Sequence, residues 1–306
     1  MSHNHIHTAG EHNHLTEHAG DVKNVKLAFF LNFGFSLIEF VGGFFTNSMA
    51  ILSDAVHDLG DSLSLGLAWY FQKYSSKRRD KIYTYGYKRF SLIGALVNSI
   101  VLIVGSILIL SESVPRLFHP KPANAEGMFL LAILGIIVNG IAYFRMHSDK
   151  NLNERVVSLH LLEDVLGWIA VLIGSAIMHF TYAPIIDPIL SILIAIFVLS
   201  NVYRNLRDLF RIILQGTPEE IKTDDLVKSL EGVTSIDSVH DLHLWSVDGT
   251  YNVLTVHVVV TSELSMEQLS EVKDSIRNIL NKQGIEHITI EFETLDEHCG
   301  MENCCE

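Results

Sequence analysis

Apolar residues dominate the chain up to about residue 204, in six stretches that each approach the roughly 20 residues an α-helix needs to cross a bilayer. The stretches lie at about 25–45, 49–72, 91–112, 127–147, 157–180 and 184–204. Short polar connections separate them, which favours a compact helical bundle. The pattern predicts a bundle of six transmembrane helices over residues 23–208, in contact with the lipid bilayer and preceded by a polar tail at 1–22.

A different pattern begins near residue 209, where the long apolar stretches end. Pro218 followed by Glu219 and Glu220 predicts a helix start, because proline suits the first helical position and acids suit the first turn. This polar helix is expected to end near Gly232.

The segment after Gly232 is typical of a small α+β domain. Asp248-Gly249 between two β-branched stretches indicates a hairpin turn. The elements expected are strands at about 236–247 and 251–260, a helix at about 265–282 and a strand at 288–293. The order αββαβ predicts a domain over 209–296 with its helices on one face of a three-stranded sheet, followed by a tail at 297–306.

Basic residues cluster in alternate connections between the apolar stretches. The connection between the second and third stretches holds Lys73, Lys77, Arg78, Arg79, Lys81, Lys88 and Arg89. The first-to-second and fifth-to-sixth connections hold no Lys or Arg. By the positive-inside rule, we expect a multi-pass protein with both termini in the cytoplasm.

The net charge of −13 comes from the C-terminal part of the chain. Residues 1–210 hold 16 basic and 16 acidic residues, whereas residues 211–306 hold 6 and 19. An acidic domain argues against nucleic acid as a partner and suits cations. The chain's cysteines, Cys299, Cys304 and Cys305, all lie in the last eight residues, which indicates thiolate ligands rather than a disulfide framework.

The N-terminal tail is rich in histidine and lacks the apolar region of a signal peptide. Its histidines are His3, His5, His7, His12, His14 and His18. Two interpretations stay open: the tail binds metal weakly and passes it on, or it is a solvated tail with no role in transport.

Two His-x-x-x-Asp pairs fall inside apolar stretches. His57 and Asp61 lie in the second stretch, and His160 and Asp164 lie in the fifth. Residues four apart share a helical face, and ionisable groups at membrane depth are functional by default. Imidazole and carboxylate ligands suit Zn²⁺, so two facing helices would supply four tetrahedral ligands. Because histidine titrates near physiological pH, His57 and His160 are also the expected proton carriers.

Other polar residues in these stretches have several interpretations. Asp54, one turn before His57, is expected either to hold a metal ligand in place or to relay protons, whereas Asp58 and Glu163 are weaker candidates because they point about 100° from their neighbours. Glu39 is either protonated or faces a water-filled cavity, and Asp187 is expected to cap a helix. Interhelical hydrogen bonds are the expected role of Asn32, Asn98 and Asn139.

At several motifs the sequence resembles the cation diffusion facilitators. These are proton-coupled zinc exporters that include bacterial cobalt–zinc–cadmium resistance exporters and animal vesicular zinc transporters. The motifs are SMAILSDAVHDLGD, YTYGYKRFSLIGALVN, SLHLLEDVLGWIAVLIG, VHDLHLW and HITIEFE. Together they cover nearly the whole chain.

The resemblance implies a six-helix bundle, a metallochaperone-like cytoplasmic domain and a homodimer. It also implies a transport site at His57, Asp61, His160 and Asp164, with alternating access and proton exchange. A histidine at the first position resembles the zinc-preferring members, with Cd²⁺ and Co²⁺ as further substrates. In the soluble domain it implies zinc at His240, His257 and Glu293, which residue chemistry alone would leave as structural.

Two further expectations concern the tail and the location. His287 with Cys299, Cys304 and Cys305 would form a third zinc site, although their spacing is not that of common zinc motifs, and the alternative is a frayed tail. The connection between the fourth and fifth stretches is not rich in histidine and there is no long tail, which suits a bacterial plasma membrane. Zn²⁺ is the expected ion, with no organic cofactor.

Two other functions fit the sequence less well. An intramembrane zinc enzyme should show an HExxH helix, which neither HDLGD nor HLLED provides, so no enzyme activity is expected. A membrane-anchored metal sensor would leave the two His-x-x-x-Asp pairs without a role.

Overall fold

The structure is a computed structural model that describes residues 30, 32–75, 77–147, 152–261 and 264–297. It divides into two compact units. One holds the chain up to Trp69 together with Val97–Tyr203, and the other holds Tyr70–Leu96 together with the chain from Arg204 onward. The predicted His-rich tail at 1–22 and the predicted ligands Cys299, Cys304 and Cys305 lie outside the described residues.

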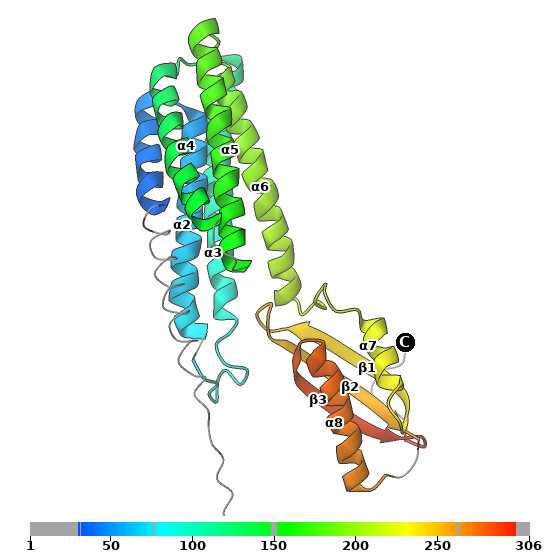
Figure 1. The fold of residues 1–306 in the computed structure, drawn as a ribbon. Coiled ribbons are helices and arrows are strands. Elements are labelled where there is room, and N and C mark those ends of the chain that lie inside the picture. The colour runs from blue at the N-terminus through cyan, green and yellow to red at the C-terminus, as the bar shows by residue number, and fades with distance from the viewer. Residues whose placement is uncertain (1–29, 31, 76, 148–151, 262–263, 298–306) are drawn as a thin grey trace, which may run out of the picture. The chain divides into compact units, whose positions relative to one another are not determined.

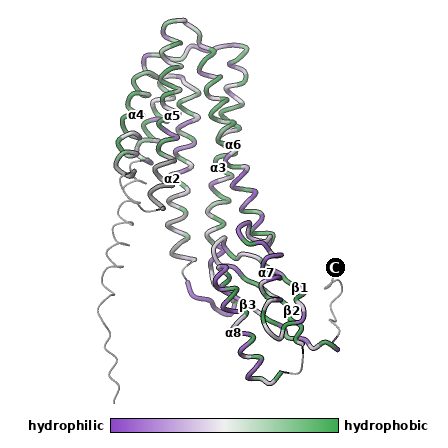
Figure 2. The backbone as a smooth tube through the Cα atoms, turned by 45° about the vertical axis from the view of Figure 1, so that its right-hand side comes forward, coloured by the Kyte–Doolittle hydropathy of each residue, from purple (hydrophilic) through white to green (hydrophobic). Residues whose placement is uncertain are grey.

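The first unit consists of long helices that run roughly parallel in Figures 1 and 2, and three of them continue into the second unit. They are a first helix over residues 32–46, then α2 (Met49–Ser75), α3 (Phe90–Phe118), α4 (Ala125–His147), α5 (Leu152–Thr181) and α6 (Ile186–Ile213). Figure 2 shows hydrophobic residues concentrated along them. Helices α3 and α6 continue past the ends of the predicted apolar stretches at about 112 and 204.

Within the described residues, four helices are long and apolar enough to cross a membrane: Phe90–Phe118, Ala125–Phe144, Leu161–Thr181 and Ile186–Ile213. Helix α2 differs from these because Asp54, Asp58 and Asp61 interrupt its apolar stretch. The predicted count of six spans is therefore not confirmed.

Among the described residues of this unit, Trp168 of α5 is the largest fully buried side chain. Its ring lies edge-on to Phe35 of the first helix, with centroids 5.9 Å apart. On the other side it packs directly on Gly135 of α4, where an added Cβ would lie 2.3 Å from the indole Cδ2. Glycine at this position allows α4 and α5 to approach closely.

The Gly135→Ala variant is expected to lower the free energy of unfolding by about 1–3 kcal/mol, because the fixed indole ring cannot move away from the new methyl group. Thermal unfolding in detergent micelles measures this. Gly140→Ala in the same helix is the matched control, since nothing lies within 4 Å of its added Cβ. Equal midpoints for the two variants would contradict the expected clash.

The second unit contains the predicted αββαβ domain. Its elements are α7 (Thr223–Glu231), β1 (Ile236–Ser246), β2 (Asn252–Val260), α8 (Met266–Lys282) and β3 (Ile285–Thr294). The sheet order is β1-β2-β3, with β1 antiparallel and β3 parallel to β2. The predicted hairpin, helix and last strand are confirmed, and β3 begins three residues earlier than expected.

Helices α7 and α8 cover one face of this sheet. Their buried residues join alternate residues of the strands in one core: Leu226, Leu230, Leu244, Leu254, Val256, Val258, Val272, Ile276, Leu280 and Ile285. Ile288, Ile290 and Phe292 of β3 pack against it, as their alternation predicts. The side chains of His257 and Glu293 therefore lie on the opposite face of the sheet.

The predicted helix start at Pro218 is wrong, because α7 begins at Thr223. Pro218 instead lies in a turn, where its carbonyl accepts a hydrogen bond of 3.3 Å from the amide of Ile221. The carboxylate of Glu219 pairs with Arg211 at the end of α6. Pro218 and Glu219, which predicted a helix start, therefore form a turn and an ion pair instead.

The connection between α2 and α3 is ordered around Asp80. Its carboxylate accepts hydrogen bonds from the amides of Tyr83 (2.8 Å) and Ile82 (2.9 Å) and from the Tyr87 hydroxyl (2.6 Å). These donors, the Tyr83 amide foremost, lower the pKa of Asp80 to about 2. Because the folded pKa lies below the ordinary value, this stabilisation is present above about pH 4 and is lost as the pH falls through 2.

The same connection contacts the β1–β2 turn of its own unit. The Lys88 ammonium lies 3.6 Å from the centroid of the Tyr251 ring, and Arg89 Nε donates to the carbonyl of Val247 at 3.3 Å. The basic residues of this connection are thus in part structural.

Candidate metal centres

Helix α2 is anchored at its first turn by a residue of another helix. Asp187 of α6 accepts hydrogen bonds from the amides of Met49 (2.8 Å) and Ala50 (3.2 Å) and from the Ser48 hydroxyl (2.6 Å). A carboxylate at a helix N-terminus satisfies free amides and suits the helix dipole. The predicted capping role of Asp187 is confirmed, but the helix that it caps is α2.

Two turns further along α2 lie His57 and Asp61, with His57 Nε2 3.7 Å from Asp61 Oδ2. The i,i+4 spacing brings them together as the sequence predicts. Asp58 joins them, since ligand atoms of the three residues all lie within 4.8 Å of one another. Asp58 was predicted to be a weaker candidate because of its direction from the helix axis, yet its carboxylate lies close to the ligand atoms of His57 and Asp61.

Helix α5 faces α2 at this level. A Cβ added at Gly167 would lie 3.9 Å from Asp54 Oδ1, so the Asp54 carboxylate lies against the backbone of α5 there. Asp164, one turn before Gly167, is buried and within electrostatic reach of Asp58. The backbone of His160 belongs to α5, but its side chain lies outside what the structure describes. A carboxylate of α5 thus lies within electrostatic reach of Asp58 on α2, while the predicted set of four ligands stays a prediction.

Glu39 of the first helix is fully buried beside this group. It is within electrostatic reach of Asp54, Asp58 and Asp164, and its carboxylate lies beside the side chains of Asp58 and Trp168. The sequence singled out Glu39 as an ionisable residue in an apolar helix but did not connect it with α2 and α5. That connection depends on how the helices pack.

The predicted roles of three membrane asparagines have different outcomes. Asn32 donates to the carbonyl of Asp58 (3.4 Å) and to the Ser62 hydroxyl (3.3 Å), which links the first helix to α2. For Asn98 and Asn139 an interhelical bond stays a prediction, because Asn98 Oδ1 and Asn139 Nδ2 have no hydrogen-bond partner among the described residues.

A second cluster lies on the open face of the sheet. His240 and His257 are directly opposite each other on β1 and β2, and Glu293 lies on β3. Glu293 Oε1 is 2.6 Å from His257 Nδ1, and Oε2 is 3.2 Å from His240 Nε2. His240 Nε2 is buried and makes no hydrogen bond with the described residues. Two imidazoles and one carboxylate at these distances form a donor set that fits Zn²⁺.

The third predicted site is not assembled by the described residues. The ring of His287 lies edge-on to Tyr85, with centroids 5.4 Å apart, and not beside the second cluster. Its predicted cysteine partners lie outside the described residues, so this site stays a prediction.

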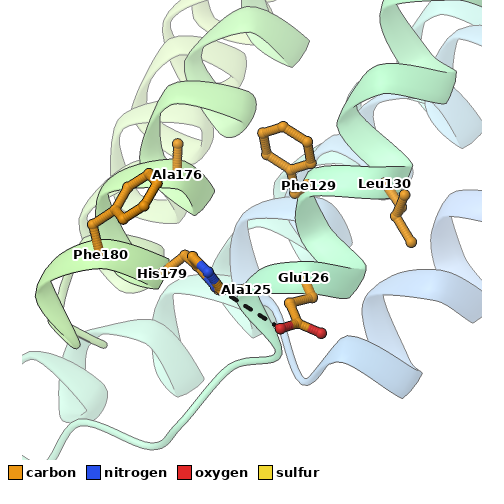
Figure 3. A pocket seen from close by; sticks show the side chains of 7 residues that line it. All are labelled: Ala125, Glu126, Phe129, Leu130, Ala176, His179 and Phe180. Carbon is orange, nitrogen blue, oxygen red and sulfur yellow. Dashed lines mark ion pairs between the residues drawn. The ribbon is translucent and has the colours of Figure 1, made fainter.

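A pocket of about 420 Å³ lies between the start of α4 and the end of α5 (Figure 3). Ala125, Phe129, Leu130, Ala176 and Phe180 line it, and His179 Nδ1 lies 4.0 Å from Glu126 Oε1 at its edge. None of the predicted metal ligands lines this pocket, so it is separate from both clusters.

Comparison with known proteins covers nearly the whole chain. The family model for the cation efflux transmembrane domain matches residues 25–214, and that for the cytoplasmic domain of cation efflux proteins matches residues 218–295. The chain is 35% identical over 287 residues to the cadmium, cobalt and zinc/H⁺-K⁺ antiporter of Bacillus subtilis, covering 92% of both chains.

Two further relatives are similar over comparable lengths. The zinc transporter ZitB of Escherichia coli is 34% identical, with 96% of this chain and 93% of the relative covered. The metal cation efflux system protein CzcD of Cupriavidus metallidurans is 33% identical, with 90% and 87% covered.

Proposed function

This chain belongs to the cation efflux family, the cation diffusion facilitators, and from this premise we propose that it exports Zn²⁺ from the cytoplasm in exchange for protons, as a homodimer. The observation that carries the proposal is the group formed by His57, Asp58 and Asp61 on α2, with Asp164 of α5 nearby. Ionisable groups are rarely kept in apolar helices without a transported ion or a counter-charge.

The proposed transport site consists of His57, Asp61, His160 and Asp164. Imidazole nitrogen and carboxylate oxygen are ligands that Zn²⁺ accepts in a tetrahedron. The same atoms bind protons, so a proton arriving at His57 or His160 competes with the metal for its ligand. Alternating access would expose the site first to the cytoplasm, where it takes the metal, and then to the other side, where protons help to release it.

The proposed topology has six membrane spans, with both termini in the cytoplasm. It is supported by the basic residues of the α2–α3 connection and by the absence of Lys and Arg from the connections after the first helix and after α5. The bacterial relatives support residence in a bacterial plasma membrane. Helix α2 would be the costly span, because it carries the carboxylates of the site.

In the cytoplasmic domain we propose a second zinc position at His240, His257 and Glu293. When bound there, zinc would link all three strands of the sheet, because each ligand comes from a different strand. The match of this domain to the cytoplasmic domain of cation efflux proteins supports a role in the homodimer. Zinc at this position would serve regulation and not transport.

The test is flux in liposomes that contain the full chain and an imposed proton gradient. We expect Zn²⁺ to move against the protons, with Cd²⁺ and Co²⁺ also carried and Mn²⁺ carried poorly, because imidazole favours the borderline ions. A zinc-sensitive and a pH-sensitive dye follow both ions, and protein-free liposomes are the control. Metal binding without flux would identify a sensor and contradict the proposal, as would zinc flux that ignores a collapsed proton gradient.

A further inference from the structure

Asp241 lies between His240 and His243 in β1, at an irregularity in the pairing of β1 with β2. Its φ is +47°, a left-handed conformation that aspartate adopts more readily than most residues. In a regular strand, Asp241 would point to the face opposite His240. A bulge re-aims the side chain of the extra residue, and here the Asp241 carboxylate reaches the ring of His257 on the face that holds the cluster.

The ring of His257 lies between carboxylates on both of its nitrogens. Nδ1 is 2.6 Å from Glu293 Oε1, within the donor cluster. On the far side, Nε2 is 3.5 Å from Asp241 Oδ2 and 3.5 Å from Glu291 Oε2. The Asp241 side chain is 14% exposed and that of Glu291 is 62% exposed, so Asp241 acts in the less hydrated environment, where its attraction is stronger.

A neutral imidazole has one nitrogen that can bind a metal and one that carries the proton. If Nδ1 of His257 binds the ion, its proton must lie on Nε2 and needs an acceptor there. The other oxygen of Asp241 lies 3.0 Å from His243 Nε2, which holds the carboxylate from its second side. Asp241 thus lies where it can determine both the tautomer and the rotation of the His257 ring.

We propose that Asp241 is a positioning residue for the cytoplasmic metal site: it holds His257 with the ring proton on Nε2, so that the unprotonated Nδ1 is directed toward a divalent cation shared with His240 and Glu293. The inference rests on the proposed cytoplasmic site and adds a residue that does not touch the ion. Partners of this kind raise ligand basicity and typically account for 10- to 100-fold of metal affinity.

The test is a Zn²⁺ titration by calorimetry on the full chain in detergent micelles. The titration separates classes of Zn²⁺-binding sites by affinity. The class that is lost in the His257→Ala variant is the cytoplasmic site. Asp241→Asn, which keeps the side-chain shape and tolerates a positive φ, is expected to weaken binding in this class by about 10-fold or more. Glu291→Gln is the matched control, because it removes the exposed carboxylate at the same distance, and we expect a change of less than about threefold.

Thermal unfolding of the metal-free variants separates positioning from a structural role. We expect Asp241→Asn to unfold at the wild-type temperature while its zinc affinity falls. An unchanged affinity would overturn the inference, as would an affinity that falls only together with metal-free stability. The loss of a bound ion, with the remaining affinities unchanged, would make Asp241 a ligand and overturn it too. If no class disappears in His257→Ala, the proposed cytoplasmic site itself is wrong.

Discussion

Proton-driven zinc flux is expected to fall by more than about 100-fold in His57→Ala and in Asp61→Ala. Losing only an outer partner of a ligand already costs up to about 100-fold in metal affinity or activity, and these variants lose a proposed ligand itself. His57→Ala also removes a proposed proton acceptor. Flux in liposomes under a fixed proton gradient measures the effect, with the amount of inserted protein determined for each variant.

Leu59→Ala is the matched control, because Leu59 lies between the two residues on α2 and is exposed on the helix surface. It should transport zinc at about the wild-type rate. Wild-type flux in either ligand variant, or in Asp164→Ala, would show that the site is assigned wrongly. The Asp58→Asn variant tests whether Asp58 is also a ligand. A loss of zinc flux as large as that of Asp61→Ala would add Asp58 to the ligands.

Asp187→Ala is expected to lower the free energy of unfolding by about 3 kcal/mol and to reduce zinc flux. The variant removes a buried carboxylate that accepts three hydrogen bonds at the start of α2. Hydrogen bonds to charged groups contribute about 1.5–3 kcal/mol each, and loss of a helix cap costs about 0.5–2 kcal/mol. Because Asp187 joins α6 to the helix that carries His57, its loss also disturbs the transport site.

Thermal unfolding in detergent micelles measures this cost. Asp208→Ala on the same helix is the control, since Asp208 is exposed and its loss should shift the midpoint little. Asp187→Asn keeps one acceptor oxygen, so its unfolding midpoint should lie between those of Asp187→Ala and Asp208→Ala. If Asp187→Ala unfolds at the same temperature as Asp208→Ala, the link between α6 and α2 does not stabilise the protein.

Local patterns predicted most of the elements. Alternation placed Ile288, Ile290 and Phe292 on the core side of β3, and Asp248-Gly249 predicted the turn between β1 and β2. The helix expected at about 265–282 is α8, whose start is fixed locally because Ser265 and Gln268 form reciprocal hydrogen bonds within one turn. Such signals succeed where both partners of an interaction are a few residues apart.

The start of α7 was mispredicted for the opposite reason. Pro218, Glu219 and Glu220 form a good local signal, but Glu219 finds its partners in Arg207 and Arg211 of α6. A tertiary ion pair and a turn at Pro218 replaced the expected first turn of the helix. Propensity is a weak prior that such contacts override.

By itself, the sequence determined the pairs His57/Asp61 and His160/Asp164, the αββαβ order and the triad His240, His257 and Glu293 as candidates. Helical and strand periodicity, with the family resemblance for the triad, sufficed for these. Tertiary structure alone decided that Asp187 caps α2, that Asp58 and Glu39 lie beside the membrane group, and that Asp241 reaches His257. The physical reason is that these contacts depend on how the helices pack and on a bulge that breaks the alternation of β1. The spacing of residues within one segment predicts neither.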